Sequence, residues 1–265
     1  MDLQYAIENL PVAQENIGKA TKGAAQALLG KAYLYQNKFD LAATVLDGLI
    51  DSNEHSLIED YSTLFENNNE NNAESVFEVQ YTDLEGASFD CLQCSEGNVA
   101  VGFQGVRSYS GPLFESGFSF NVPTEETYNA FDQDDLRRDY AILNIELFAQ
   151  ENIDFNNGAG VTYGEGFEHT GYFNRKYLPR KGDSNIGDPN LTNPNNYRSI
   201  RYADVLLMAA EAHNRKNPAD DTQALTYINL VRERAFGDTA HNLSLTGGAL
   251  TQAIWNERRL ELVGE

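Results

Sequence analysis

Basic residues are scarce in this sequence. Nineteen lysines and arginines stand against 40 aspartates and glutamates in the 265-residue chain, which gives a formal net charge of −21. A surface this acidic repels phosphate backbones and anionic lipid headgroups. We therefore expect no nucleic-acid partner, whereas neutral ligands such as sugars and peptides stay open.

Long apolar runs are also absent. No stretch approaches the roughly 18–20 consecutive apolar residues that a membrane-spanning helix needs. The first four residues, Met1 to Gln4, carry neither the basic region nor the apolar region of a signal peptide. The sequence therefore predicts no membrane span and no leader peptide in this stretch.

Cysteine is rare, since Cys91 and Cys94 are the only two and form one C-x-x-C pattern. A redox pair should open a helix after a strand, but the flanking residues are typical of a loop. No second cysteine pair completes a zinc site, and the four histidines are scattered. We expect a loop disulfide or two unreactive thiols, and neither a metal nor a cofactor.

Motifs of the common enzyme classes are missing. The sequence contains no G-x-S-x-G, H-E-x-x-H, G-x-x-x-x-G-K or G-x-G-x-x-G pattern. A glycosidase needs only two carboxylates facing a cleft, and 40 acidic residues guarantee chance pairs, so the sequence alone does not exclude one. The pattern nevertheless favours a binding protein that is not an enzyme.

The chain divides into three parts, which we interpret as one domain. Residues 1–75 and 201–265 show helical periodicity, whereas residues 76–200 are rich in Gly, Asn, Asp and aromatics with little periodicity. In the first part, Thr21 and Asp40 are plausible caps for two successive helices. The offsets of this helix pair match part of the tetratricopeptide pattern: Leu29, Gly30, Tyr33, Phe39, Ala42 and Leu46.

The last part predicts three helices. Arg201 to Asn214 forms the first, Ala224 to Ala235 marks a second that Gly237 ends, and Thr246 caps a third. The apolar stripe of the third helix continues into charged residues, which must be paired if they face the core. We predict a partly buried ion-pair network that joins these helices: Arg201, Glu211, Arg232, Arg234, Glu257, Arg258 and Glu261. The alternative is that the glutamates lie on a solvated face while Trp255 and Leu262 pack.

Several stretches resemble the SusD/RagB family. Residues 199–212 are similar to the family's iRyAevLLmyAEA signature, and residues 72–80 are similar to its sEsifevqf strand. Further stretches follow in the family's order: 123–137, 171–177, 228–235, 254–262 and 264–265. Upstream, residues 2–11 resemble the segment that leads into a family helix pair, and residues 24–35 resemble the pair itself. The resemblance therefore covers nearly the whole chain.

This resemblance implies both a fold and a function. The fold would be mainly α, with tetratricopeptide-like helix pairs in an α-α superhelix and a long irregular loop region containing short β-strands. Family members are lipid-anchored on the outer face of Bacteroidetes outer membranes, where they bind glycans or peptides and pass them to a SusC-like TonB-dependent transporter. Full members are much longer, so we expect a fragment or truncated form whose N-terminal lipid anchor belongs to the parent protein.

Aromatic residues in the loop region are candidates for ligand binding. Sugar sites stack aromatic rings on sugar faces and add planar polar groups for the hydroxyls. One glycine-rich stretch supplies both kinds: Phe103, Arg107, Tyr109, Phe114, Phe118 and Phe120. A second, lower-ranked candidate site combines Tyr163, Phe167 and Tyr172. For any one of these aromatics, packing of the loop onto the scaffold is the competing interpretation.

Two functions from different classes therefore remain. The first is a surface protein that binds a glycan, or a peptide as in some members of the family that the chain resembles. The second is a tetratricopeptide-type adaptor for a protein partner. An adaptor should contain contiguous repeats of about 34 residues, but here some 120 irregular residues separate the two helical parts, which favours the first.

Overall fold

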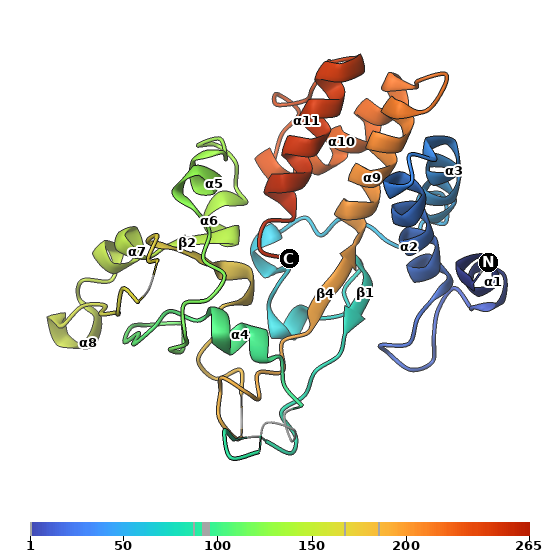
Figure 1. The fold of residues 1–265 in the computed structure, drawn as a ribbon. Helices are drawn as coiled ribbons and strands as arrows, with labels where there is room; N and C mark the ends of the chain where they lie inside the picture. Colours follow the sequence, from blue (N-terminus) through green and yellow to red (C-terminus); the bar gives the residue numbers. More distant parts are fainter. Residues whose placement is uncertain (1, 87, 92–95, 167, 185) are drawn as a thin grey trace.

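The structure is a computed structural model that describes residues 2–86, 88–91, 96–166, 168–184 and 186–265. Its elements are mainly helical, with short strands between them, which confirms the predicted fold class (Figure 1). The elements in chain order are α1 Asp2–Asn9, α2 Lys22–Tyr35, α3 Phe39–Ile50, η1 Tyr61–Thr63, η2 Asn67–Asn69, β1 Ser75–Val79, α4 Val99–Gln104, α5 Glu125–Asn129, α6 Arg138–Ala141, β2 Ile142–Asn144, α7 Ile145–Glu151, α8 Phe155–Gly158, β3 Tyr172–Asn174, η4 Arg175–Tyr177, β4 Tyr197–Arg201, α9 Tyr202–Arg215, α10 Asp221–Phe236 and α11 Gly247–Glu261.

The first helix pair, α2 and α3, begins with the predicted cap and then departs from the prediction. The Thr21 hydroxyl accepts a hydrogen bond from the backbone N–H of Ala24 at 3.1 Å, as an N-cap should. The second helix starts at Phe39, so Asp40 lies in its first turn and caps nothing. Asn37 ends the preceding turn with a positive φ of 56°. The predicted cap at Asp40 was therefore wrong by two residues, because the turn closes earlier than its composition suggests.

Gly30 brings α2 and α3 into close contact. A Cβ atom added at Gly30 would lie 2.4 Å from the Leu46 side chain, which is fully buried. We expect Gly30→Ala to lower the free energy of unfolding by about 1–2 kcal/mol, since overpacking outweighs the better helix propensity of alanine. Urea denaturation measures the change. Gly48→Ala is the matched control, because its Cβ would meet only the flexible Gln26 amide, and it should leave stability unchanged or raise it.

Helix α9 forms the centre of the helical part. Every residue from Tyr202 to Asn214 is buried, and α3, α10 and α11 pack around this helix (Figure 1). Arg201 ends strand β4 and precedes the helix, so the predicted helix start was one residue early. Gly237 ends α10 with a φ of 74°, as predicted. Thr246 precedes α11 but makes no capping bond, and the Asp221 carboxylate accepts the Gly247 N–H at 2.8 Å instead.

Two small antiparallel sheets connect the helices to the loop region. Strand β1 pairs with β4, and β2 pairs with β3, with Ile142 opposite Asn174. The β1–β4 ribbon runs directly into α9, whereas the segment from α4 to β3 lies to one side of the helices (Figure 1). Separate hydrophobic clusters stabilise these parts, one around α9 and others within the loop region.

The remaining expectations about local structure concern cysteine and membranes. Cys91 is disulfide-bonded, which agrees with the loop-disulfide expectation, and Cys94 lies outside the described residues. Within the described part of the chain, no helix is both long enough and apolar enough to cross a membrane.

Candidate functional site

Four phenylalanine rings form a partly exposed cluster in the loop region, which we call the aromatic platform: Phe89, Phe103, Phe118 and Phe120. The Phe103 and Phe120 rings stack with centroids 5.7 Å apart and an interplanar angle of 16°. Phe118 lies 5.3 Å from Phe103, and Phe89 meets Phe118 edge-on at 6.3 Å. Phe89 and Phe120 remain 51% and 55% exposed. Large apolar rings left clustered in solvent mark a binding surface more often than a packing surface.

The backbone around the aromatic platform is held by hydrogen bonds between two neighbouring segments. The N–H of Phe120 donates to the carbonyl of Phe103 at 2.9 Å, and that of Ser119 donates to Gly105 at 2.7 Å. A Cβ atom at Gly117 would lie 2.4 Å from the Gly105 Cα. Two glycines are therefore required where the segments cross, and this crossing places Phe118 and Phe120 beside the end of α4.

Arg107 supplies a polar group next to the aromatic platform. Its side chain donates to the Phe118 carbonyl at 3.0 Å, while its Nε is buried with no hydrogen-bond partner among the described residues. It lines a groove of about 410 Å³ together with Phe118, Phe120, Asn121 and Glu168. Stacking rings, a guanidinium, an amide and a carboxylate around one groove can bind a polar ligand that has apolar faces.

Tyr109 and Phe114, two of the predicted ligand-binding residues, lie in a hydrophobic cluster instead. They are only 8% and 2% exposed, and the Phe114 ring packs 5.7 Å from Phe148. The Tyr109 hydroxyl donates to the Pro112 carbonyl, and burial raises the pKa of Tyr109 to about 12. The prediction for these two residues is corrected, because their rings fill the interior of the same loop that carries Phe118 outward.

The second predicted aromatic cluster does not come together. The Tyr163 ring lies 5.9 Å from His169 and packs against the Tyr109–Phe114 cluster. Tyr172 stacks on Tyr128 at 4.7 Å in a different cluster. Phe167 lies outside the described residues. The lower-ranked site is therefore corrected, since its two described rings pack against separate cores.

A sequence profile identifies the family of this chain. The profile described as the SusD family matches residues 54–265. The chain belongs to the SusD family.

SusD-family relatives align with the chain along its whole length. A laminarin-binding SusD-like protein of known structure is 33% identical with a TM-score of 0.85, and the match covers 100% of this chain and 57% of that one. Surface glycan-binding protein A from Bacteroides thetaiotaomicron, solved with laminarihexaose, is 27% identical with a TM-score of 0.83 over 99% of this chain and 57% of that one. A SusD-like protein of Formosa agariphila is 28% identical over 100% of this chain and 52% of its own length. This chain thus spans about half the length of the curated relatives it matches.

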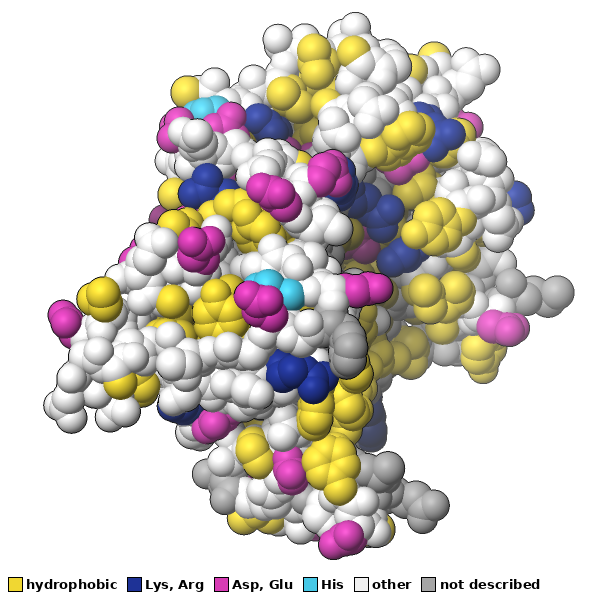
Figure 2. Space-filling model, turned by 60° about the vertical axis from the view of Figure 1, so that its left-hand side comes forward, with side chains coloured by type: hydrophobic (Ala, Val, Ile, Leu, Met, Phe, Trp, Pro, Cys, Tyr) yellow, Lys and Arg dark blue, Asp and Glu magenta, His cyan; other side chains and the backbone are white. Residues whose placement is uncertain are grey.

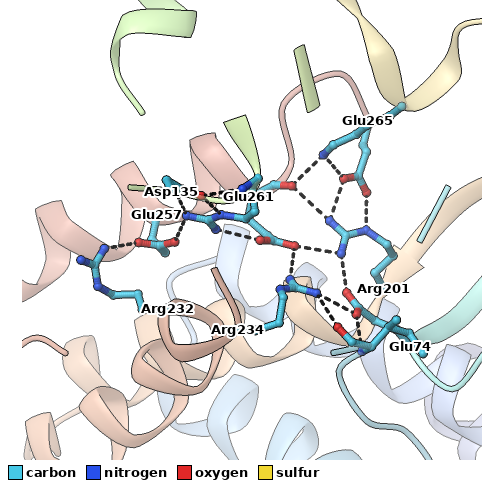
Figure 3. Close-up of polar contacts among 11 residues, drawn as sticks. Glu74, Asp135, Arg201, Arg232, Arg234, Glu257, Glu261 and Glu265 are labelled. Carbon is cyan, nitrogen blue, oxygen red and sulfur yellow. Dashed lines mark hydrogen bonds and ion pairs between the residues drawn. The ribbon is translucent and has the colours of Figure 1, made fainter. Parts of the chain in front are cut away.

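Charged side chains of this SusD-family chain form one connected network at the base of the loop region, and Figure 3 labels most of them. Glu261 is its centre, accepting from Arg137 at 2.8 Å, Arg201 at 2.9 Å and Arg234 at 2.7 Å. Glu257 pairs with Arg137 and Arg232 at 2.7 and 2.6 Å. Five cations meet five carboxylates: Arg137, Lys176, Arg201, Arg232 and Arg234 with Glu74, Asp135, Glu257, Glu261 and Glu265.

The network joins the three parts of the SusD-family chain. Glu74 precedes β1. Asp135, Arg137 and Lys176 belong to the loop region, and the remaining members lie in β4, α10 and α11 or directly after α11. Burial lowers the pKa of Lys176 to about 8, although Glu265 lies 2.5 Å away. For Glu261, burial alone would raise the pKa, but Arg234, Arg201 and Arg137 outweigh it and lower the pKa far below its usual value. Charge pairing in the interior therefore anchors the loop region to the helices.

Two predicted members of the network lie outside it. Glu211 pairs only with Arg215 one turn along α9, and Arg258 pairs with Asp204 at 2.9 Å. Neither residue is bridged to Glu261 by these pairs, so this part of the prediction is corrected. Five members were missed: Glu74, Asp135, Arg137, Lys176 and Glu265. Glu74 and Arg137 stand within stretches that resemble family elements, which was the available signal.

Proposed function

We propose that this chain binds a glycan at the aromatic platform, without catalysis, as part of a SusD-family protein. The observation that carries the proposal is the partly exposed cluster of Phe103, Phe118 and Phe120 beside the Arg107 groove. Support comes from two structural relatives described as binding laminarin or laminarihexaose. The platform lies on loops, away from the helix pairs, which favours ligand binding over a tetratricopeptide-type adaptor.

In the groove, the aromatic rings and the polar side chains would contact different parts of a sugar. A pyranose ring has apolar C–H faces, which would stack on the exposed Phe120 ring and its neighbour Phe118. Its hydroxyls both donate and accept hydrogen bonds, so they would accept from Arg107 and donate to Glu168.

We further propose that the parent protein is lipid-anchored at the outer-membrane surface and delivers its glycan to a SusC-like TonB-dependent transporter. Membership of the SusD family supports this role. Co-purification of the parent protein with a TonB-dependent barrel from detergent-solubilised outer membranes tests it. Recovery of the protein without any barrel would count against delivery, while leaving glycan binding open.

Affinity electrophoresis on a polysaccharide panel tests the binding function. We expect at least one neutral glycan in the gel to retard the chain, with laminarin the first to try. A casein hydrolysate added as a competitor should not reduce this retardation. Arg107→Gln should weaken binding by roughly 10- to 150-fold, because a charged hydrogen bond contributes about 1.5–3 kcal/mol. Lys19→Gln removes an exposed cation in the 10–20 loop and is the control, which should leave migration unchanged. Inhibition by peptides but by no glycan would favour the peptide-binding alternative.

A further inference from the structure

A second cavity in the loop region is bordered by three cationic side chains. Its volume is about 540 Å³, within the range of about 300–1,000 Å³ typical of small-molecule sites. Arg175, Arg180 and Lys181 line it, together with Glu66 and Asp183. Figure 2 looks toward the loop region and shows basic and hydrophobic side chains gathered in and around a hollow on this face.

The backbone that carries these residues is fixed by pairing between two loop segments. The N–H of Lys181 donates to the Leu113 carbonyl at 2.8 Å, and that of Glu115 donates to the Pro179 carbonyl at 2.8 Å. Phe114 and Arg180 form an antiparallel bridge between them. The cavity therefore lies at one end of the loop whose other end carries Phe118 and Phe120.

Two of the three cations form no ion pair with any carboxylate of the described residues. Arg180 pairs with Glu66 at 2.7 Å. Arg175 donates only to the Asp139 carbonyl at 2.8 Å, with its guanidinium 5.4 Å from the Tyr140 ring centre. Lys181 donates to the Gly111 carbonyl at 2.7 Å. Among the described residues, no carboxylate forms an ion pair with Arg175 or Lys181, in a chain that has 40 of them.

The electrostatics of the cavity favour the binding of an anion. Burial and the neighbouring charge of Arg180 lower the pKa of Arg175, so its positive charge is held at a cost. Burial raises the pKa of Asp183 to about 6, and its Oδ2 is buried with no hydrogen-bond partner among the described residues. A protonated Asp183 would donate a hydrogen bond to an incoming anion. The Glu261 network contains equal numbers of cations and carboxylates, whereas three cations and two carboxylates line this cavity.

We propose that this cationic cavity binds the carboxylate or sulfate group of an acidic saccharide. A guanidinium and an ammonium facing one cavity are the donors that such groups take. The saccharide part of this proposal rests on the proposed function, whereas the anionic group is inferred from the cavity alone. It assigns the protein a second contact with its ligand, at the opposite end of the loop from the aromatic platform.

Calorimetric titration of the whole chain with three probes tests the site. The probes are an oligogalacturonate, a sulfated galactose oligomer and neutral laminarihexaose. We expect at least one acidic probe to bind, and the double variant Arg175→Gln with Lys181→Gln to weaken that binding tenfold or more, with laminarihexaose unaffected. Whichever acidic probe binds more tightly identifies carboxylate or sulfate as the preferred group. Lys19→Gln is the matched control for loss of positive charge.

A gain-of-function variant keeps the test independent of folding defects. Asp183→Asn removes the negative charge that opposes an anion, so the sulfated probe should bind it severalfold more tightly at pH 7. For the unmodified chain, affinity should rise as the pH falls from 7 to 5, because Asp183 becomes neutral near pH 6. The groups facing Asp183 are Arg180, Glu66 and Glu70, and burial also raises the pKa of Glu70. The pH response should be much smaller in Asp183→Asn.

The outcomes separate this proposal from the proposed function. Equal binding of acidic probes by the unmodified chain and the double variant would overturn the cationic site. So would the absence of acidic binding while laminarihexaose binds. Binding of an acidic probe that depends on Arg175 and Lys181 but not on Phe118 and Phe120 would support the cationic site and count against the aromatic platform.

Discussion

Replacement of Glu261 by glutamine is expected to lower the free energy of unfolding by about 3–5 kcal/mol, the cost of breaking a buried ion pair on one side. The glutamine keeps the shape but no longer neutralises Arg137, Arg201 and Arg234, which all lie within 3 Å of the carboxylate. Urea denaturation followed by circular dichroism measures the loss. Glu126→Gln breaks an exposed pair with Arg259 and should have no measurable effect. Unchanged stability of the Glu261 variant would contradict a structural role for the network.

The ion-pair network also determines how the free energy of unfolding changes with pH. The pKa of Glu265 is lowered because Arg201 and Lys176 outweigh the effect of burial, and the pKa of Glu261 is lowered in the same way. A carboxylate with a lowered folded-state pKa binds fewer protons when folded than when unfolded. Its contribution is therefore fully present above its unfolded pKa of about 4.3 and is lost as the pH falls further. Acid unfolding of the Glu261→Gln chain should start from lower stability and depend less steeply on pH.

Removal of Phe118 and Phe120 from the aromatic platform is expected to weaken glycan binding by about 30–150-fold. Phe118→Ala and Phe120→Ala together delete two stacking faces, each contributing about 1–1.5 kcal/mol. Phe120 is more than half exposed, so its removal should cost little stability, and the loss from Phe118 is measured by urea denaturation of the same variant. Titration calorimetry with the glycan that gives the strongest retardation measures the affinity. Full affinity in the double variant would show that the ligand binds elsewhere.

A matched variant of the buried ring separates binding from folding. Phe114→Ala removes a side chain that is 2% exposed and packs against Tyr109 and Phe148. It should cost about 3–5 kcal/mol of stability, with glycan affinity retained in the fraction of molecules that stays folded. The two variants should therefore show opposite patterns of affinity and stability, although both remove phenylalanines from the same loop.

The helices were predictable because their signals are local. Thr21, Gly237 and the apolar spacing of α2, α9 and α10 are read within one or two turns of the chain, and the structure follows them. The cap predicted at Asp40 was wrong because Asn37 ends the preceding turn and the helix already begins at Phe39. Boundaries of this kind depend on a single backbone conformation, which composition does not determine.

The candidate site was predictable only in part, because exposure is decided by tertiary packing. Phe114 and Phe118 are four residues apart in a glycine-rich loop, yet one ring is buried and the other joins the aromatic platform. Phe89 carried no local signal at all, since it reaches Phe118 from a separate segment. The ion-pair network has the same character: Arg201 meets Glu74, which is 127 residues away. Pairing over such separations follows from the fold and cannot be read from periodicity.

The charge balance of the network changes the electrostatic character of the outer surface. With five of the 19 cations and five of the 40 carboxylates neutralising each other in the network, 14 cations remain against 35 carboxylates elsewhere. The folded chain must therefore carry a dense atmosphere of counter-cations. An acidic ligand diffuses against this field until it comes within about one Debye length, roughly 8–10 Å, of a local cation. A neutral sugar meets no such barrier, so the field sorts ligands by charge during the encounter, before any side chain touches them.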